Sequence, residues 1–284
     1  MSPSPQVVRT IAQLHDVIRQ WQGAGETHAL IPTMGALHNG HLALVQLGRQ
    51  RGQRTVASIF VNPAQFAPTE DLARYPRDEA GDLAKLASVG CDLVWAPEPA
   101  EMYPHGFSTR IVPAGAALGL EADFRPGFFS GVATVCCKLF NQVLPTVAIF
   151  GEKDYQQLCV IKQMVRDLNL PVAILGAPTL REPDGLAMSS RNRFLSPEER
   201  RLAPAIHEAL QAVAKVARSG GDVEAATSEA IRVLTWKGFK VDYVAVRDAE
   251  TFDRPAAGPL RPLRVLAAAR LGNTRLIDNV GTGT

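Results

Sequence analysis

Strand-like and helix-like segments alternate along residues 1–179, and this alternation restricts the possible folds more than any other feature of the chain. Short apolar, β-branched runs predict strands at His28–Pro32, Thr55–Val61, Cys91–Ala96, Val147–Phe150 and Val172–Leu175. Apolar residues at helical spacing predict helices at Ile11–Gln22, Gly40–Arg51, Asp78–Ser88, Val132–Val143 and Tyr155–Asn169. Such βαβ units surround a parallel sheet that is covered on both faces. We therefore expect a doubly wound, Rossmann-like α/β domain whose ligands bind beyond the carboxyl ends of its strands.

The regular alternation of apolar strands and helices ends at residue 179. The stretch 179–197 is polar and charged, and Ser196-Pro197-Glu198-Glu199 has the residues of a helix start. Two helices and three short strands are predicted beyond it, at Pro197–Ser219, Val223–Gly238, Val241–Arg247, Leu263–Arg270 and Thr274–Asp278. Residues 180–284 should therefore form a smaller α+β domain, which we expect to act as a lid over the first.

Charge and cysteine content exclude several classes of protein. The formal net charge is only +2 over 284 residues and is spread out, so neither nucleic acid nor an acidic membrane is an expected partner. The N-terminus lacks the apolar core of a signal peptide, and no segment reaches membrane-spanning length. No Cys-x-x-Cys pair occurs, so each cysteine is predicted to be a small buried apolar residue. The four are Cys91, Cys136, Cys137 and Cys159. This usage fits a reducing compartment, and we expect the cytoplasm.

The most informative segment runs from Pro32 to His41, between a predicted strand and a predicted helix. Gly35 and Gly40 have the separation found in a phosphate-binding P-loop, but His41 and Leu42 replace its Lys-Ser/Thr pair. Two histidines three residues apart at a helix N-terminus favour phosphate binding, because both rings and the helix end attract anions. Two alternatives remain open: one structural and one surface histidine, or a zinc site, although no third ligand lies nearby.

A second polar segment, Gly151–Gln157, also follows a predicted strand. Charged and amide side chains at the end of an apolar strand are costly unless they bind a ligand. Lys153 has the charge to neutralise phosphate, Asp154 can accept hydrogen bonds from ribose hydroxyls, and Gln157 can both donate and accept. The alternative is a helix N-terminus that carries acidic residues for its own stability.

Two further loops add polar groups. Met188-Ser189-Ser190-Arg191 lies in the irregular linker, where hydroxyls and a guanidinium suit a clamp that closes on polyphosphate. A solvated hinge is the alternative for this segment. The loop Asn62–Phe66 follows another predicted strand and brings the amides of Asn62 and Gln65 to the expected ligand edge.

Taken together, these segments resemble a known family. The histidine pair and the later Met-Ser-Ser-Arg are similar to the paired signatures of the nucleotidylyltransferase superfamily, which includes the class I aminoacyl-tRNA synthetases. More narrowly, the chain resembles the pantoate–β-alanine ligases. The matching blocks occur in order and span most of the chain: Pro32–His41, Phe60–Phe66, Arg125–Val132, Gly151–Gln157 and Asp184–Asn192, with a similar ending at Ala268–Asn279.

The resemblance implies a two-step reaction. ATP, with Mg²⁺ on its phosphates, and (R)-pantoate would give pantoyl-adenylate and pyrophosphate, and β-alanine would then displace AMP. It also implies a homodimer. The implied catalytic residues are His41, His38 and Lys153. The implied ATP-binding residues are Met34, Gly35, Ala36, Leu37, His38, Asn39, Gly40, His41, Gly151, Glu152, Lys153, Asp154, Leu180, Met188, Ser189, Ser190 and Arg191. Gln65 and Gln157 would hold pantoate, with Asn62 nearby and Gln65 also approaching β-alanine; no residue is expected to bind a metal directly.

One position departs from the family pattern. Phe128 stands where relatives usually have a histidine, and a phenylalanine cannot hydrogen-bond to phosphate. We leave Phe128 out of the expected site and assign no role to Arg125. The substitution either weakens activity or is neutral, if the usual histidine only supports other residues.

Two other functions compete with the ligase. A transferase of the same superfamily would make a stable nucleotide-linked product from a phosphorylated substrate, which would require more cationic contacts than Gln65 and Gln157 offer. A non-catalytic nucleotide-binding module is the other, since a fold does not fix a function. The presence of His38, His41, Lys153 and Arg191 disfavours that module.

Overall fold

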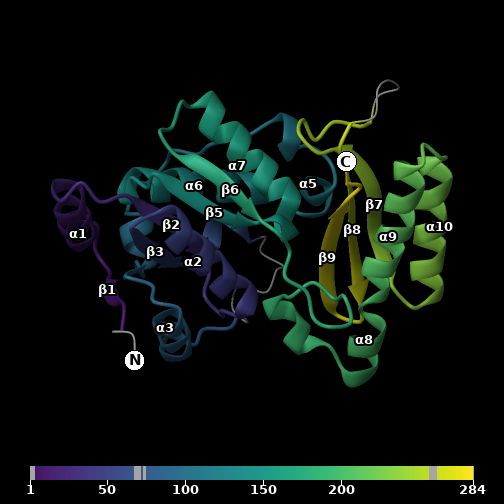
Figure 1. Ribbon diagram of the computed structural model, residues 1–284, viewed down its shortest axis with the longest axis horizontal. Coiled ribbons are helices and arrows are strands. Elements are labelled where there is room, and N and C mark those ends of the chain that lie inside the picture. The colour runs from purple at the N-terminus through teal and green to yellow at the C-terminus, as the bar shows by residue number, and fades with distance from the viewer. Residues whose placement is uncertain (1–3, 67–71, 73–74, 256–260, 284) are drawn as a thin grey trace.

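The computed structural model describes residues 4–66, 72, 75–255 and 261–283. Figure 1 shows a larger α/β domain joined to a smaller domain that contains the C-terminus. The larger domain carries a six-stranded sheet and the smaller one a separate three-stranded sheet. The predicted combination of a doubly wound domain and a small α+β domain is confirmed.

All strand pairings in the larger sheet are parallel. The strands are β1 (Gln6–Val8), β2 (His28–Thr33), β3 (Arg54–Ile59), β4 (Leu93–Trp95), β5 (Val147–Gly151) and β6 (Ala173–Ala177). Their order is β1-β4-β3-β2-β5-β6, so the chain builds outward from β2 in one direction and then from β5 in the other. The loops after β2 and β5 therefore diverge at the topological switch point, where doubly wound sheets bind ligands.

Helices cover both faces of this sheet. They are α1 (Ile11–Gly23), α2 (Asn39–Arg51), α3 (Glu79–Ser88), α4 (Pro99–Met102), α5 (Glu121–Phe124), α6 (Phe128–Val143) and α7 (Tyr155–Asp167). The described residues of this domain also form the short 3₁₀ helices η1 (Pro63–Gln65), η3 (Gly115–Ala117) and η4 (Glu152–Asp154). Side chains of α1, α6 and α7 share one apolar core with the sheet, and those of α2 and α3 share another. Both faces of the strands are thus buried, which explains their nearly continuous apolar sequences.

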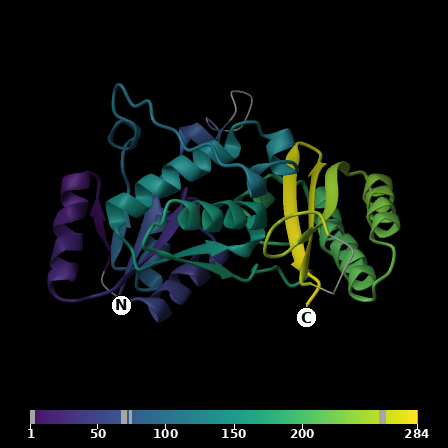
Figure 2. The same cartoon turned by 90° about the horizontal axis from the view of Figure 1, so that it is seen from above.

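The smaller domain follows β6 and packs against the larger one. It contains η5 (Ser190–Phe194), α8 (Pro197–Leu202), α9 (Ala205–Arg218), α10 (Val223–Trp236), β7 (Lys240–Asp248), β8 (Leu263–Leu271) and β9 (Thr274–Gly281). Side chains alternate across its antiparallel sheet, so Val265 and Ala267 pack in the core with α9. Leu266 instead joins Leu120 and Cys159 of the larger domain in a buried cluster. Figure 2 shows this sheet between its own helices and the larger domain.

Most predicted elements agree with the observed bounds to within two residues, but three differ further, and the short elements β1, α4 and α5 were not predicted. Strand β1 was not predicted, because three residues are too few to establish a pattern. The single helix expected over Pro197–Ser219 is two helices, α8 and α9, separated at Pro204, which has no N–H to donate. Helix α6 starts four residues early, at Phe128, directly after the left-handed Gly127. Strand β9 continues past Asp278 to Gly281, because β8 offers it pairing partners.

Among the residues that the structure describes, no helix is long and apolar enough to cross a membrane.

Candidate active site

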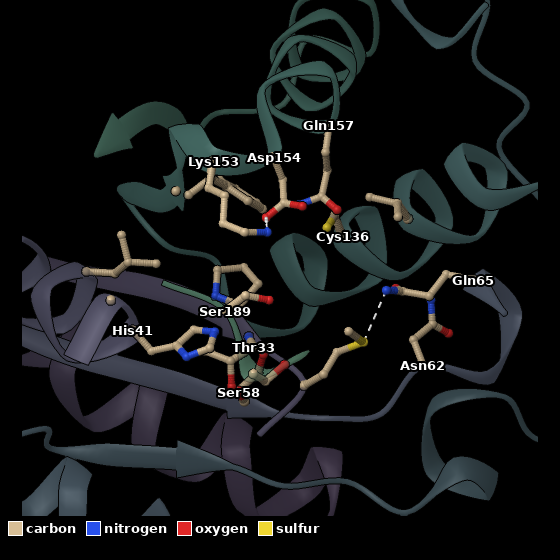
Figure 3. A pocket seen from close by; sticks show the side chains of 18 of the residues that line it. Thr33, His41, Ser58, Asn62, Gln65, Cys136, Lys153, Asp154, Gln157 and Ser189 are labelled. Carbon is tan, nitrogen blue, oxygen red and sulfur yellow. Dashed lines mark hydrogen bonds and ion pairs between the residues drawn. The ribbon is translucent and has the colours of Figure 1, made fainter. Parts of the chain in front are cut away.

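A cavity of about 220 Å³ opens at the carboxyl ends of the parallel strands. Because β2 and β3 pair in register from His28 and Arg54 to Thr33 and Ile59, the loops that follow them begin side by side. The loops after β5 and β6 and the segment 188–191 of the smaller domain complete the wall. Figure 3 shows His41 on one side, facing Lys153, Asp154 and Gln157, with Gln65 to the side.

The two histidines lie together at the start of α2, with ring centroids 4.2 Å apart. His38 Nδ1 accepts a hydrogen bond from the backbone N–H of Gly40 at 3.1 Å, and His41 Nδ1 accepts one from the N–H of His38 at 3.3 Å. A nitrogen that accepts cannot carry the ring hydrogen, so each neutral ring has its hydrogen on Nε2. Both side chains line the cavity and can act there as N–H donors.

The environment keeps both rings neutral. Burial lowers the pKa of His41 to about 3, with further contributions from His38, Lys153 and Lys85. Burial and the charge of Lys153 lower the pKa of His38 to about 4, although Asp154 opposes that shift. The pair therefore offers hydrogen bonds to an anion without competing for a proton near neutral pH.

The loop 34–38, which leads into α2 and its histidine pair, is held by a residue that the sequence analysis did not identify. Asp82 on α3 is 1% exposed, and its two carboxylate oxygens accept the backbone N–H groups of Ala36 and Leu37, each at 2.8 Å. Lys85, one turn along α3, donates to the Leu37 carbonyl at 2.9 Å. Asp82 thus stabilises a loop in which Ala36 has an unusual positive φ of 51°. Its signal in the sequence was weak, since an acid near a helix start is common.

Replacing Asp82 with asparagine should loosen this loop. The new amide places an NH₂ group against a backbone N–H, which breaks one bond and leaves a buried donor unsatisfied. We expect a loss of about 1–3 kcal/mol in the free energy of unfolding, measured by urea denaturation. Asp78→Asn is the matched control, because Asp78 caps the same helix and asparagine caps equally well. Equal stability of the two variants would contradict the role given to Asp82.

The segment after β5 turns through η4 into α7 and divides its side chains between two directions. Lys153, Asp154 and Gln157 line the cavity, and Lys153 Nζ lies 3.8 Å from Asp154 Oδ2. The neighbouring Gln156 is buried and donates to the carbonyls of Ala116 and Gly119, so its amide is structural. The Glu152 carboxylate points to the smaller domain instead.

Gln65 is fixed by its neighbours. Its Nε2 donates to the sulfur of Met34 at 3.1 Å, and its Oε1 accepts from Asn62 Nδ2 at 3.0 Å. Asn62 is 1% exposed and also bonds to Gly131, Ala64 and Tyr103, so its donors and acceptors are all used within the protein. Asn62 therefore orients Gln65, and its contact with substrate stays a prediction. Gly131 is required there, because a Cβ would lie 2.2 Å from the Ala64 carbonyl oxygen.

Phe128, at the position where the family resemblance implies a histidine, packs against the arginine beside it. The guanidinium carbon of Arg125 lies 3.7 Å from the Phe128 ring centroid, which is cation–π stacking at close range. Arg125 also donates to the Gln65 carbonyl at 3.2 Å and lines the cavity. The phenylalanine thus stacks on an arginine that lines the cavity.

The segment 188–191 is more ordered than the expected irregular linker. Ser189 caps η5, and its hydroxyl accepts from the Arg191 N–H at 3.2 Å. Asn192 donates to the Ala187 carbonyl, and an isolated bridge joins Ala187 to Arg181. Met188, Ser189, Ser190 and Arg191 all line the cavity.

Most of the predicted residues meet at this cavity. Those that line it are Met34, His38, Gly40, His41, Asn62, Gln65, Gly151, Lys153, Asp154, Gln157, Leu180, Met188, Ser189, Ser190 and Arg191. Five predicted residues are not in its lining: Gly35, Ala36, Leu37, Asn39 and Glu152. The sequence analysis missed an apolar wall formed by Phe60, Val132, Val135, Cys136 and Leu139. Burial raises the pKa of the Cys136 thiol to about 12, which agrees with the prediction that this cysteine is a small buried apolar residue.

Comparisons with known proteins agree with this geometry. The family model described as pantoate-beta-alanine ligase matches residues 6–281. A pantothenate synthetase of a Bradyrhizobium species is 53% identical over 281 residues, and one of Caulobacter vibrioides is 52% identical over 283, each alignment covering 99% of both chains.

Solved structures give the same result. The pantothenate synthetase of Thermus thermophilus superposes with a TM-score of 0.91 at 46% identity, covering 98% of this chain and all of that one. The pantoate-beta-alanine ligase of Francisella tularensis, solved with beta-gamma ATP and beta-alanine, gives 0.83 at 33% identity and covers 99% of each chain. The chain belongs to the pantoate–β-alanine ligase family.

Proposed function

We propose that this chain joins (R)-pantoate to β-alanine at the expense of ATP, through a pantoyl-adenylate intermediate. One observation carries the proposal: hydrogen-bond donors and a lysine suited to phosphate face uncharged amides and an apolar wall across a single cavity. A nucleotide and a small hydroxy acid can therefore be bound next to each other. Membership of the family supports the same assignment.

In the first step, a carboxylate oxygen of pantoate attacks the α-phosphorus of ATP, and the bond to the pyrophosphate oxygen breaks. Negative charge builds up on the phosphate oxygens during this displacement. The Nε2–H groups of His38 and His41 can donate to them, and the Lys153 ammonium can neutralise them. These donors are held by the backbone before the reaction begins, so little reorganisation is needed.

In the second step, the β-alanine amine attacks the acyl carbon of the mixed anhydride. The carbon–oxygen bond to AMP breaks, the amide forms, and the ammonium proton passes to solvent. Adenylation is needed because a free carboxylate is a poor acceptor, whereas AMP is a good leaving group. Gln65, which lies at the end of the cavity near Arg125, is suited to approach both carboxylate substrates.

The shape of pantoate fits the other half of the cavity. Its two hydroxyls and its carboxylate can bond with the amides of Gln65 and Gln157. Its dimethyl carbon needs an apolar surface, which Val132, Cys136 and Leu139 supply. Of the three cationic side chains among the described residues that line the cavity, Lys153 and Arg191 are assigned to the nucleotide, which leaves Arg125 for a phosphorylated substrate.

Mg²⁺ is proposed to arrive with ATP rather than in a protein cage. Among the described residues, no group of three or more histidine, cysteine or acidic side chains can hold a metal, and Asp154 is the one acid in the cavity lining. This donor set fits a cation bound largely by phosphate oxygens and water. Asp154 and the Ser189 and Ser190 hydroxyls, which line the cavity, could supply oxygen contacts to such a complex. When bound, Mg²⁺ would neutralise phosphate charge.

We also propose that the protein is a cytoplasmic homodimer without nucleic-acid or membrane partners. The family resemblance supports the dimer, and the small net charge supports the absence of polyanionic partners. Light scattering on the purified protein tests the dimer directly, and a monomer mass would rule it out.

The proposed function is tested by measuring products with ATP, Mg²⁺ and pantoate, with and without β-alanine. Pantothenate and AMP should accumulate only when β-alanine is present, and pyrophosphate should appear in the first turnover without it. Pyrophosphate formed in repeated turnovers with no amine would instead favour a nucleotidyltransferase. Nucleotide binding without any turnover would indicate that the protein is inactive as a ligase, and Phe128 would be the first position to examine as the cause.

Gln65→Ala should impair pantoate use more than ATP use. The side chain is oriented by Asn62 and Met34 and faces the proposed acid site, so its loss removes a substrate contact. We expect the KM for pantoate to rise about 10-fold or more while the KM for ATP changes less than about 3-fold. Gln20→Ala, on an exposed part of α1, is the control. An unchanged dependence on pantoate would argue against this placement of Gln65.

A further inference from the structure

A side chain of the smaller domain holds the backbone on both sides of Lys153. Asn279 on β9 is 2% exposed, and its Nδ2 donates to the carbonyl oxygen of Glu152 at 2.9 Å and to that of Lys153 at 2.7 Å. Its Oδ1 accepts from Arg264 Nε. Both amide hydrogens are therefore committed to η4, the 3₁₀ helix that carries Lys153 into the cavity.

These two carbonyls belong to the two peptide planes that flank the Lys153 Cα atom. Peptide planes are rigid, and φ and ψ of a residue are the only soft rotations between them. Fixing both planes therefore fixes φ and ψ of Lys153, and with them the direction of its Cα–Cβ bond. One asparagine side chain thus sets where the lysine side chain begins.

Arg264 on β8 reinforces the same arrangement. Its guanidinium donates to the Glu152 carboxylate at 3.0 Å, and its central carbon lies 4.1 Å from the Tyr155 ring centroid. The Tyr155 hydroxyl in turn donates to the Ala249 carbonyl at 2.7 Å. Residues 152 and 155 are thus held by the smaller domain, while Lys153 and Asp154 between them face the cavity.

We propose that Asn279 is a positioning residue for the reaction, through which the smaller domain directs Lys153 at the nucleotide phosphates. This proposal rests on the proposed function for the role of Lys153. Asparagine suits the position because one nitrogen carries two hydrogens for two successive carbonyls. Serine has one donor, alanine has none, and aspartate would place a negative charge against two carbonyl oxygens.

The test is a double-mutant cycle between Asn279→Ala and Lys153→Met in the full-length protein. The rate of pyrophosphate release in the first turnover is measured with ATP, Mg²⁺ and pantoate. We expect Asn279→Ala to slow this step about 10- to 100-fold in the wild-type background, the scale of a misdirected catalytic group. In the Lys153→Met background the same change should cost less than about 3-fold, because the side chain it directs is gone.

Tyr243→Phe is the matched control at the same domain junction. Tyr243 donates to Glu121 at 2.9 Å, and Arg275 still holds that carboxylate without it, so the control removes a contact between the domains but leaves η4 alone. It should leave the rate within about 3-fold of wild type. If Asn279→Ala does not fold, Asn279→Ser keeps one donor and takes its place in the cycle.

Equal losses from Asn279→Ala in both backgrounds, or no loss in either, would overturn the proposal, because Asn279 would then be a purely structural contact. The same cycle is run on affinity for α,β-methylene ATP, which requires no reaction, and non-additive losses there support the proposal. If the wild-type protein releases no pyrophosphate, the proposed function fails, while the affinity cycle still decides the role of Asn279.

Discussion

Replacing His41 with alanine should lower the rate of adenylate formation by roughly 100-fold or more, the usual scale for a lost transition-state donor. The ring lines the cavity, and its Nδ1 accepts a backbone hydrogen bond, so Nε2–H remains as the donor that the ring offers to a ligand in the cavity. His41→Gln should retain part of the activity, because the amide nitrogen of glutamine can occupy a similar position. Rates of pyrophosphate release in the first turnover measure the effect.

His105→Ala is the control, because His105 is exposed and does not line the cavity. Turnover of His41→Ala within about 3-fold of wild type would remove His41 from the mechanism.

A second measurement, on the same His41→Ala protein and the wild type, examines the charge state of the His41 ring. Since burial lowers the pKa of His41 from 6.5 to about 3, the unfolded chain binds a proton on this residue between these pH values and the folded chain does not.

Stability should therefore decrease as the pH falls below 6.5, and the variant should lose less stability over that range than the wild type. His38 behaves alike, with its pKa lowered to about 4, so some acid sensitivity should remain in the variant. Urea denaturation at a series of pH values measures both curves. Parallel curves would show that His41 is already free to protonate in the folded protein.

Lys153→Met should reduce kcat/KM for ATP by about 100-fold or more. Methionine keeps much of the length of the side chain and removes its charge, and Lys153 is the one lysine among the described residues that line the cavity. Lost charge at the phosphates should slow the chemical step, because negative charge increases on them during the displacement. Steady-state kinetics with ATP varied at saturating pantoate measure the loss.

Lys162→Met, on an exposed position of α7, controls for the change of residue type. Lys153→Arg provides a finer test, since it retains the charge but replaces a compact ammonium with a broad, planar group. We expect Lys153→Arg to recover only part of the activity. A Lys153→Met protein that used ATP normally would exclude the electrostatic role and would also leave Asn279 without a catalytic purpose.

The sequence predicted the fold well because the fold depends on local patterns. Buried parallel strands must be apolar, and their helices must be amphipathic, so the order of elements could be read directly from 1–179. The predictions were wrong where local pattern was short or interrupted, as at β1 and at Pro204. Strand β9 extends to Gly281 because its pairing with β8 is a tertiary interaction.

The site was predictable to the extent that its residues are clustered in the chain. His38 and His41, or Lys153 and Asp154, are neighbours in sequence, and both segments follow strands whose ends meet at one edge of the sheet. The apolar wall was missed because the α6 residues that form it, such as Val132 and Cys136, look like ordinary core residues. Nothing in their sequence distinguishes a wall that faces a cavity from one that faces a sheet.

By itself, the sequence predicted the doubly wound sheet, the smaller α+β domain and the side chains proposed to act on the substrates, since these depend on periodicity and on residue type. Only the tertiary structure decided which other side chains hold the site residues in position. Asp82 lies 46 positions from Ala36, and Asn279 lies 126 positions from Lys153. A buried hydrogen bond across such a separation leaves no local pattern, because it depends on how the chain packs and not on the residues beside it.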